Sequence, residues 1–244
     1  MTTYPVIEIA TPTAPVSTVT PPDNTVPGQA GISLTLDRAV PMEDGFLIYA
    51  TLHWEDTKYT SVDFDDSQAA IHLLDANGRK VFYELVNDEY TGMKYDQRQT
   101  VFAIKTAPVQ SAGPLTIVVD NVKVEMPKLP AEASFIFDPG PDPQDGQTWQ
   151  LDQKLQIGET SLRVVSVTAF QIGYSFEMES DSGILGADLT DLEHPIVAGG
   201  GGGENGRFSS SFTYLNGWPA GPVTVTITSI SVLRAGPWQA TWQR

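Results

Sequence analysis

The stretch GPLTIVVDNVKV, from Gly113 to Val124, recurs in this chain as GPVTVTITSISV, from Gly221 to Val232. The first Gly, the Pro and the Thr are identical, and apolar residues return at matching positions. The offset is 221 − 113 = 108 residues, close to half of the 244-residue chain. Apolar and polar residues alternate over much of both copies, which is typical of half-buried β-strands. The repeat therefore predicts two copies of one β-unit.

The same period of two extends over most of the chain. It is strict in Gly31–Leu36 and present in Leu162–Val167, while Phe46–Leu52 and Tyr174–Met178 have the composition of further strands. Turn signals such as Asn216-Gly217 separate these runs. A helical period extends nowhere beyond about two turns, which is short for a globular helix. The sequence predicts an all-β fold.

The size of each copy suggests the kind of unit. A repeat of roughly 105–110 residues with about seven short strands matches an immunoglobulin-like sandwich. The segment DPGPDPQDG at 138–146 is rich in proline and predicts a short stiff linker. We therefore expect two tandem immunoglobulin-like β-sandwich domains, at residues 30–138 and 139–244. Residues 1–29 are rich in Thr and Pro and predict a disordered stalk or linker.

Composition excludes several classes of function. The chain has 14 Lys and Arg against 30 Asp and Glu, a net charge of −16, which argues against binding to nucleic acid or to an anionic membrane surface. It has no cysteine, so disulfides, thiolate metal sites and cysteine nucleophiles are excluded. A hydrophobic fraction of 41% is enough for a packed core. There is no apolar run of about 18 residues and no signal-peptide pattern.

No reactive motif stands out. His53, His72 and His194 lie far apart, and each lacks a catalytic or metal-binding motif around it. The run Gly199–Gly203 lacks the lysine of a phosphate-binding loop and predicts a flexible hairpin loop between edge strands. We expect no catalytic residues and no cofactor, and predict that the protein is not an enzyme.

Acidic clusters make calcium the only metal with some support. Asp63, Asp65 and Asp66 fall in one short loop, and a second group falls in the linker. Calcium requires several oxygen ligands, but neither group has the spacing of an EF-hand. The linker group gives three weak calcium candidates, Asp138, Asp142 and Asp145. The alternative is that these residues form a solvated acidic loop.

Tryptophans are candidates for the core and for ligand contact. Trp238 and Trp242 alternate with polar residues, which places both indoles on one strand face and favours burial over a sugar-binding platform. Trp218 lies in the turn-rich stretch Asn216–Pro222. It is therefore the better candidate for an exposed contact with a partner or ligand.

The turn and strand residues carry a family resemblance. Gly221–Ile230 followed by Gly236–Ala240, together with the opening Gly31–Glu55, resembles the extracytoplasmic region of bacterial membrane-bound anti-sigma-factor-like proteins of uncharacterised function. In that family a cytoplasmic segment, a membrane helix and a linker precede immunoglobulin-like domains. The resemblance implies an extracytoplasmic, cell-surface ectodomain whose anchor or export signal is not in this chain, and it implies no catalytic positions.

These observations predict a non-enzymatic extracytoplasmic sensor or interaction module of an envelope-anchored bacterial protein. The expected partner is an unidentified protein or cell-wall ligand, with no nucleic acid and with membrane contact only through the missing anchor. The alternative is a carbohydrate-binding module that uses exposed Trp residues of the second domain.

Overall fold

The chain is all-β over the residues that the computed structural model describes, which are 29–64, 70–109, 112–127, 133–157, 160–180, 183–204 and 206–243. The expected tail at 1–28 lies outside these residues. The helical elements among them are two 3-10 turns, η1 (Gln29–Gly31) and η3 (Tyr95–Gln97). The strands are β1 (Ile32–Met42), β2 (Gly45–Trp54), β3 (Ser61–Asp63), β4 (Ile71–Leu74), β5 (Tyr83–Val86), β6 (Gly92–Lys94), β7 (Gln99–Thr106), β8 (Leu115–Pro127), β9 (Ser134–Phe137), β10 (Thr148–Ile157), β11 (Thr160–Phe170), β12 (Gly173–Glu179), β13 (Ile184–Asp191), β14 (Ile196–Glu204), β15 (Arg207–Tyr214) and β16 (Val223–Trp242). None of the described helices has the length and apolar composition to cross a membrane.

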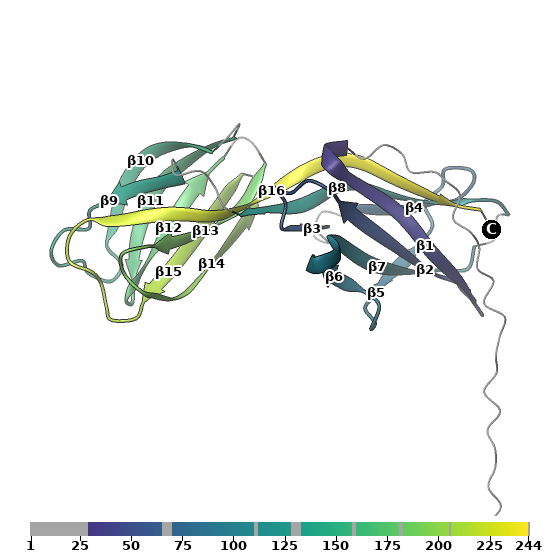
Figure 1. Cartoon of the computed structure of the whole chain (residues 1–244), viewed down its shortest axis with the longest axis horizontal. Helices are drawn as coiled ribbons and strands as arrows, with labels where there is room; N and C mark the ends of the chain where they lie inside the picture. The colour runs from purple at the N-terminus through teal and green to yellow at the C-terminus, as the bar shows by residue number, and fades with distance from the viewer. Residues whose placement is uncertain are drawn as a thin grey trace, which may run out of the picture.

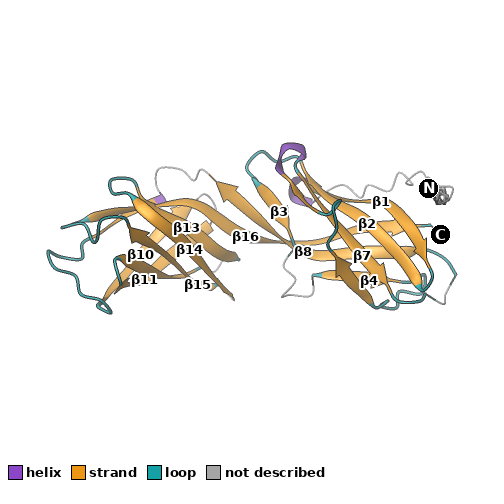
Figure 2. Cartoon of the chain, turned by 90° about the horizontal axis from the view of Figure 1, so that it is seen from below, coloured by secondary structure: helices purple, strands orange, loops and turns teal. Residues whose placement is uncertain are grey.

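The strands form three antiparallel sheets, as Figures 1 and 2 show. Sheet A has the order β1-β2-β7-β5, with β6 also on β7, and sheet C has the order β10-β11-β12-β15-β14. Sheet B has the order β13-β16-β8-β3, with β4 on β8 and β9 on β16. The first lobe is sheet A with β3, β4 and the adjoining parts of β8 and β16. The second lobe is sheet C with β9, β13 and the first part of β16. Sheet B is thus shared between the lobes.

Two long strands, β8 and β16, join the lobes (Figure 1). They pair with each other from Ser229 opposite Pro127 to Trp242 opposite Leu115, with a bulge between Ala235 and Trp238. These strands contain the two copies of the sequence repeat. Val124 pairs with Val232, and 232 − 124 = 108, so this one pair of residues that are equivalent by the repeat lies directly opposite in the two neighbouring strands. The same offset relates β7 to β15, since 207 − 99 = 108.

The final strand of each repeat lies in the other lobe. β9 follows the first repeat and pairs with Val223–Thr226 in the second lobe. Residues 238–242 follow the second repeat and pair with residues 115–119 in the first lobe. The strand pairing therefore departs from the expected bounds of 30–138 and 139–244, because both lobes are completed by residues from across that boundary. The sandwich class is confirmed, and a count of two separate immunoglobulin-like domains stays a prediction.

The proline-rich segment at 138–146 does not join the lobes. It connects β9 to β10, and both of these strands belong to the second lobe. The Gly146 N–H donates a hydrogen bond to the Ala169 carbonyl (2.8 Å), which holds the segment against β11. The crossing between lobes is made by hydrogen-bonded strands, β8 and β16.

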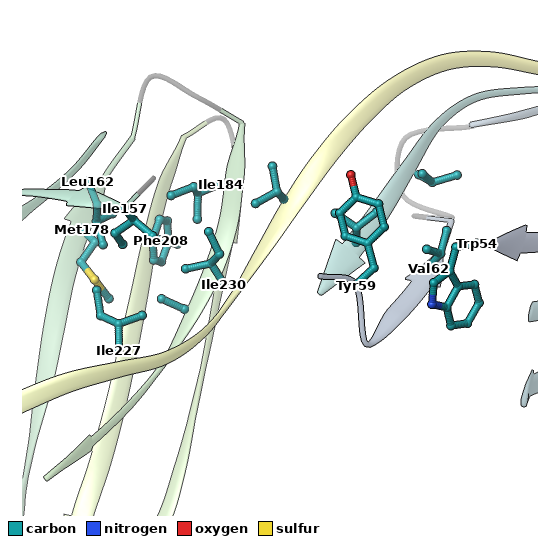
Figure 3. Packing of buried hydrophobic residues seen from close by; sticks show 14 of the residues in the cluster. Trp54, Tyr59, Val62, Ile157, Leu162, Met178, Ile184, Phe208, Ile227 and Ile230 are labelled. Atoms are coloured by element: carbon teal, nitrogen blue, oxygen red, sulfur yellow. The ribbon is translucent and has the colours of Figure 1, made fainter. Parts of the chain in front are cut away.

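Alternating apolar residues fill the space between the sheets. The buried side chains form one continuous cluster through both lobes. Figure 3 shows this packing, with Trp54, Tyr59 and Val62 on one side of the crossing and Ile184 and Ile230 on the other. Burial of such apolar area is the main favourable term in folding.

The prediction that Trp238 and Trp242 face the core is confirmed, since they are 3% and 7% exposed. Both pack in the first lobe because this part of β16 lies there. The Trp238 indole N–H donates to the Ile32 carbonyl (2.9 Å), and the ring centres of Trp242 and Phe46 lie 4.8 Å apart in an edge-to-face arrangement.

Candidate functional site

The glycine run forms part of a strand. Residues 199–203 lie inside β14 and pair with β15, from Gly199 opposite Phe212 to Gly203 opposite Phe208. The prediction of a flexible hairpin loop is therefore wrong. Glycine is depleted in strands because it adds no packing side chain, so the run gave a loop-like signal.

Close approach of the two strands explains why some of these glycines fit. A Cβ on Gly201 would collide with the Ser209 carbonyl oxygen, and a Cβ on Gly203 would collide with the Arg207 carbonyl oxygen. At Gly200 and Gly202, by contrast, a Cβ would find no atom within 4 Å. Because the run has no side chains, neither face of β14 is covered by its own residues here.

β14 is an exposed sheet edge. Within the described residues it pairs with β15 alone, and its other edge has no ladder partner. The other outer strands of sheets A and C carry the usual protection against edge pairing. β1 and β10 are bulged and charged, and β5 and β6 are short. β14 has nine residues, and residues 198–204 pair without a bulge.

A slot opens between β14 and the unpaired edge of β13. We call it the β13–β14 slot; its volume is about 290 Å³. It lies beside the crossing of the lobes, and its lining is Leu185, Gly186, Ala187 and Asp188 of β13, Gly201, Gly202 and Gly203 of β14, and Asp63, Phe64, Lys123 and Ser231. Among the described residues, the edges of β13 and β14 that line this slot have no ladder partner.

The slot carries two carboxylates and one ammonium group. The Asp188 Oδ2 atom accepts a hydrogen bond from the Ser229 hydroxyl (2.5 Å), which fixes its side chain. The Asp63 Oδ1 atom accepts from the Phe64 backbone N–H (2.9 Å). With Lys123 the balance of formal charge is −1, of the same sign as the whole chain.

A second cluster lies on the outer face of sheet A. A bulge between Leu36 and Arg38 allows Asp37 and Arg38, which are neighbours in sequence, to reach the same face. The Arg38 guanidinium lies 4.1 Å from the centre of the Tyr49 ring. The Asp37 Oδ2 atom accepts from the Thr51 hydroxyl (2.6 Å). Burial raises the pKa of Asp37, and the Thr51 and Thr35 hydroxyls oppose part of that rise.

The loop between β5 and β6 folds over this face. Asp88 shapes it by accepting hydrogen bonds from the backbone N–H groups of Tyr90 (2.8 Å) and Thr91 (3.2 Å). Asp88 also accepts a hydrogen bond from the Tyr49 hydroxyl (2.5 Å). Burial is the main cause that raises the pKa of Tyr49, and the hydrogen bond to Asp88 raises it further. The loop brings the Tyr90 ring to 4.7 Å from the Arg38 guanidinium.

The histidines lie at separate places. His72 Nε2 meets Asp120 Oδ2 at 2.8 Å in the first lobe, and His194 Nδ1 meets Asp191 Oδ2 at 2.8 Å in the second. The Asp191 side chain is fully buried and also accepts from the Tyr214 hydroxyl (3.1 Å). Asp191 and His194 thus hold the turn that follows β13, where Asp191 Oδ1 also accepts from the backbone N–H groups of Glu193 and His194. No described Ser or Thr hydroxyl is hydrogen-bonded to His194 as a nucleophile would be.

The calcium candidates are engaged in local contacts. Asp138 Oδ1 accepts from the Gly140 N–H (2.9 Å), and Asp145 Oδ1 accepts from the Gln171 N–H (2.7 Å). Asp142 is exposed. Asp65 and Asp66 lie outside the described residues. In the part of the chain that the structure describes, no group of three or more His, Asp or Glu side chains could hold a metal ion.

Trp218 is half-buried. Its indole N–H donates to the Gly173 carbonyl (3.1 Å), and its ring packs against the core. Only part of the Trp218 ring is therefore exposed for the contact with a partner or ligand that the sequence predicts.

Comparison of the chain with protein-family models, with curated proteins and with solved structures finds no match.

Sequence reasoning missed both the β13–β14 slot and the Tyr90 cluster. The slot depends on which strand edges remain unpaired, and pairing is a long-range property. For the cluster, the sequence offered one usable signal: the charged pair Asp37-Arg38 interrupts the alternation of β1. Such a break within a strand pattern is consistent with a bulge.

Proposed function

We propose that the protein is a non-enzymatic interaction module that captures an extended segment of a partner protein in the β13–β14 slot. The observation that carries the proposal is the edge of β14 beside a slot, which has no ladder partner among the described residues and is built from the glycines of Gly199–Gly203. An extended segment can add to such an edge as a further strand, with main-chain hydrogen bonds giving affinity and side-chain pockets giving specificity.

The glycines favour this mode of binding. Because Gly200 and Gly202 leave open space over the sheet, side chains of an added strand could lie across β14 without collision. Glycines within a sheet can be covered by large side chains from a neighbouring strand. Phe212 and Phe208 already lie opposite Gly199 and Gly203 on the β15 side. The added strand would supply the same kind of cover on the other side.

Charge selects the partner. Two copies of a chain with a net charge of −16 repel each other, which disfavours self-pairing at β14. Asp63 and Asp188 in the slot would attract Lys or Arg in the incoming segment, whereas Lys123 would oppose them. The occupant proposed is therefore an extended segment of a different protein, with Lys or Arg beside apolar residues.

The setting we propose is the outside of a bacterial cell, where the module would act as a sensor or adhesive part of an envelope-anchored protein. The supports are the resemblance in sequence and the Thr/Pro-rich composition of residues 1–29, which suits a stalk. Digestion of intact cells with an external protease, followed by detection with an antibody against this chain, tests the location. Loss of the signal is expected, and full protection would contradict it.

Peptide selection tests the binding mode. Random ten-residue peptides displayed on phage would be selected on the intact chain, and binding of the recovered peptides measured by fluorescence polarisation. Basic peptides with alternating apolar residues are expected. A double substitution, Asp63→Asn with Asp188→Asn, should weaken their binding by about tenfold if each exposed charge pair contributes up to about 1 kcal/mol.

The double substitution Asp96→Asn with Asp142→Asn serves as the matched control, because it removes two exposed carboxylates outside the slot. Its effect on peptide binding should be small. Equal weakening by the control and by the double substitution in the slot would show that only net charge is sensed. Failure to recover any peptide with a Kd below about 1 mM would contradict strand capture.

A further inference from the structure

We propose a second binding site, for a neutral saccharide, in the hollow on the outer face of sheet A. We call it the Tyr90 hollow; it measures about 270 Å³ and is shallow. Its rim and floor include Asp37, Arg38, Tyr49, Tyr90, Lys94 and Gln99. The site is independent of the β13–β14 slot and involves none of its residues.

The hollow is held by a preorganised set of contacts. The Arg38 guanidinium lies 4.1 Å from the Tyr49 ring centre and 4.7 Å from that of Tyr90, so two aromatic rings hold one cation. The two rings meet edge to face at 6.2 Å. Tyr49 is tied to Asp88 by its hydroxyl, and Asp88 orders the loop that carries Tyr90. A ligand that binds here would therefore find fixed groups, which lowers the ordering cost of association.

Charged side chains of both signs surround the hollow. Arg38 and Lys94 form no ion pair among the described residues, although both lie close enough to Asp37 to lower its pKa. The Asp37 carboxylate accepts hydrogen bonds, and Arg38 and Lys94 donate them. Gln99 uses its side-chain N–H on Gln97 and keeps an oxygen that can accept a further bond. Donors and acceptors thus stand side by side.

This mixture matches the chemistry of a sugar. Each sugar hydroxyl both donates and accepts a hydrogen bond, as serine and threonine hydroxyls do. Tyr90 is 49% exposed, and its ring offers an apolar surface on which the C–H face of a pyranose ring can lie. A shallow hollow of this size fits one sugar unit or the side of a longer chain, and it is smaller than sites that enclose whole drug-sized ligands.

Charged ligands fit less well. An anion would meet Asp37 and Asp88 near the two cations, within a chain of net charge −16. An organic cation would meet the Arg38 guanidinium and the Lys94 ammonium, which both line the hollow and would repel it. The hollow therefore favours a neutral, hydroxyl-rich ligand.

The test is retention on polysaccharides. The intact chain would be incubated with cellulose, xylan, mannan, chitin and purified peptidoglycan, and the bound fraction measured at increasing protein concentration. We expect binding to at least one of these glycans. Tyr90→Ala should weaken it by about tenfold, since it removes the apolar surface. Tyr95→Ala is the matched control, because Tyr95 is 68% exposed and does not line the hollow.

Each outcome is decisive. Retention of the wild-type chain with loss in Tyr90→Ala but not in Tyr95→Ala supports the site. Equal retention of all three proteins would place any sugar contact elsewhere and overturn it. Absence of wild-type binding to all five glycans would also overturn it. Peptide capture in the β13–β14 slot should be the same for Tyr90→Ala and wild type, so failure of either proposal is recognised separately.

Discussion

Val124 and Val232 are equivalent residues of the sequence repeat, and they lie directly opposite each other where β8 and β16 pair. This pair marks the centre of an arrangement in which each half of the chain completes the lobe of the other. Both side chains are fully or almost fully buried, at 0% and 1% exposure. The stability of one lobe should therefore depend on residues of the other half.

Substitution at this centre should weaken both lobes together. Val124→Ala and Val232→Ala should each lower the free energy of unfolding by about 2 kcal/mol, because each removes buried methyl groups at the shared strand pair. Hydrogen exchange read by mass spectrometry should show faster opening in peptides of sheets A and C alike. Val40→Ala, at a 41% exposed position, should change stability by less than about 0.5 kcal/mol. Loosening of one lobe alone would contradict shared folding.

The exchange of end strands predicts that the first half cannot fold alone. A fragment of residues 30–138 lacks the strand at 238–242 and with it the buried Trp238 and Trp242. Its amide NMR spectrum should be poorly dispersed. Addition of a peptide covering residues 233–243 should restore dispersion, since it supplies the missing strand. A well-dispersed spectrum of the fragment by itself would favour the simple tandem arrangement.

The repeat and the alternation allowed a large part of this fold to be predicted. The all-β class, several strands and the burial of Trp238 and Trp242 follow from a period of two, which depends on local geometry. The exchanged strands could not be predicted, because the pattern of 238–242 says which face is buried and not which neighbour it pairs with. Likewise, no residue type in Gly199–Gly203 distinguishes an open sheet edge from a loop.

Two buried tyrosines in the second lobe differ in the hydrogen bonding of their hydroxyl groups. The Tyr214 hydroxyl donates to the buried Asp191, whereas the buried Tyr174 hydroxyl has no hydrogen-bond partner among the described residues. Tyr214→Phe should cost about 1–3 kcal/mol of stability, because a buried carboxylate loses a donor. Tyr174→Phe should be neutral or stabilising, because no bond is lost. Urea unfolding of both variants measures the difference, and equal effects would contradict these assignments.

The same tyrosines predict a loss of stability at high pH. Burial raises the pKa of Tyr174 to about 12, and burial with the Asp191 charge raises that of Tyr214 further. Because the folded-state pKa lies above the unfolded value of 10.0, the neutral hydroxyl contributes stability that is fully present below pH 10. This contribution is lost as the pH rises through the folded-state pKa. Melting temperature should therefore fall above about pH 10. Tyr174→Phe should show a smaller fall, and an identical profile would contradict the shift.

Neighbouring glycines of β14 should respond in opposite ways. Gly201→Ala should lower stability by about 1–3 kcal/mol, since its Cβ collides with the Ser209 carbonyl. Gly202→Ala meets open space and should be neutral or raise stability by about 0.4–1 kcal/mol. Thermal melts compare the two. If both substitutions were harmless, the segment would behave as a loop, which would contradict a strand edge at Gly199–Gly203.

The most direct test of strand capture is the exchange of the backbone amides of Gly199–Gly203, followed by NMR in the free chain and with a selected peptide. In an edge strand, alternate N–H groups point away from the partner strand. We predict that alternate glycine amides exchange rapidly in the free chain and become protected when the peptide binds. A peptide that binds while these amides keep their exchange rates would contradict capture at β14.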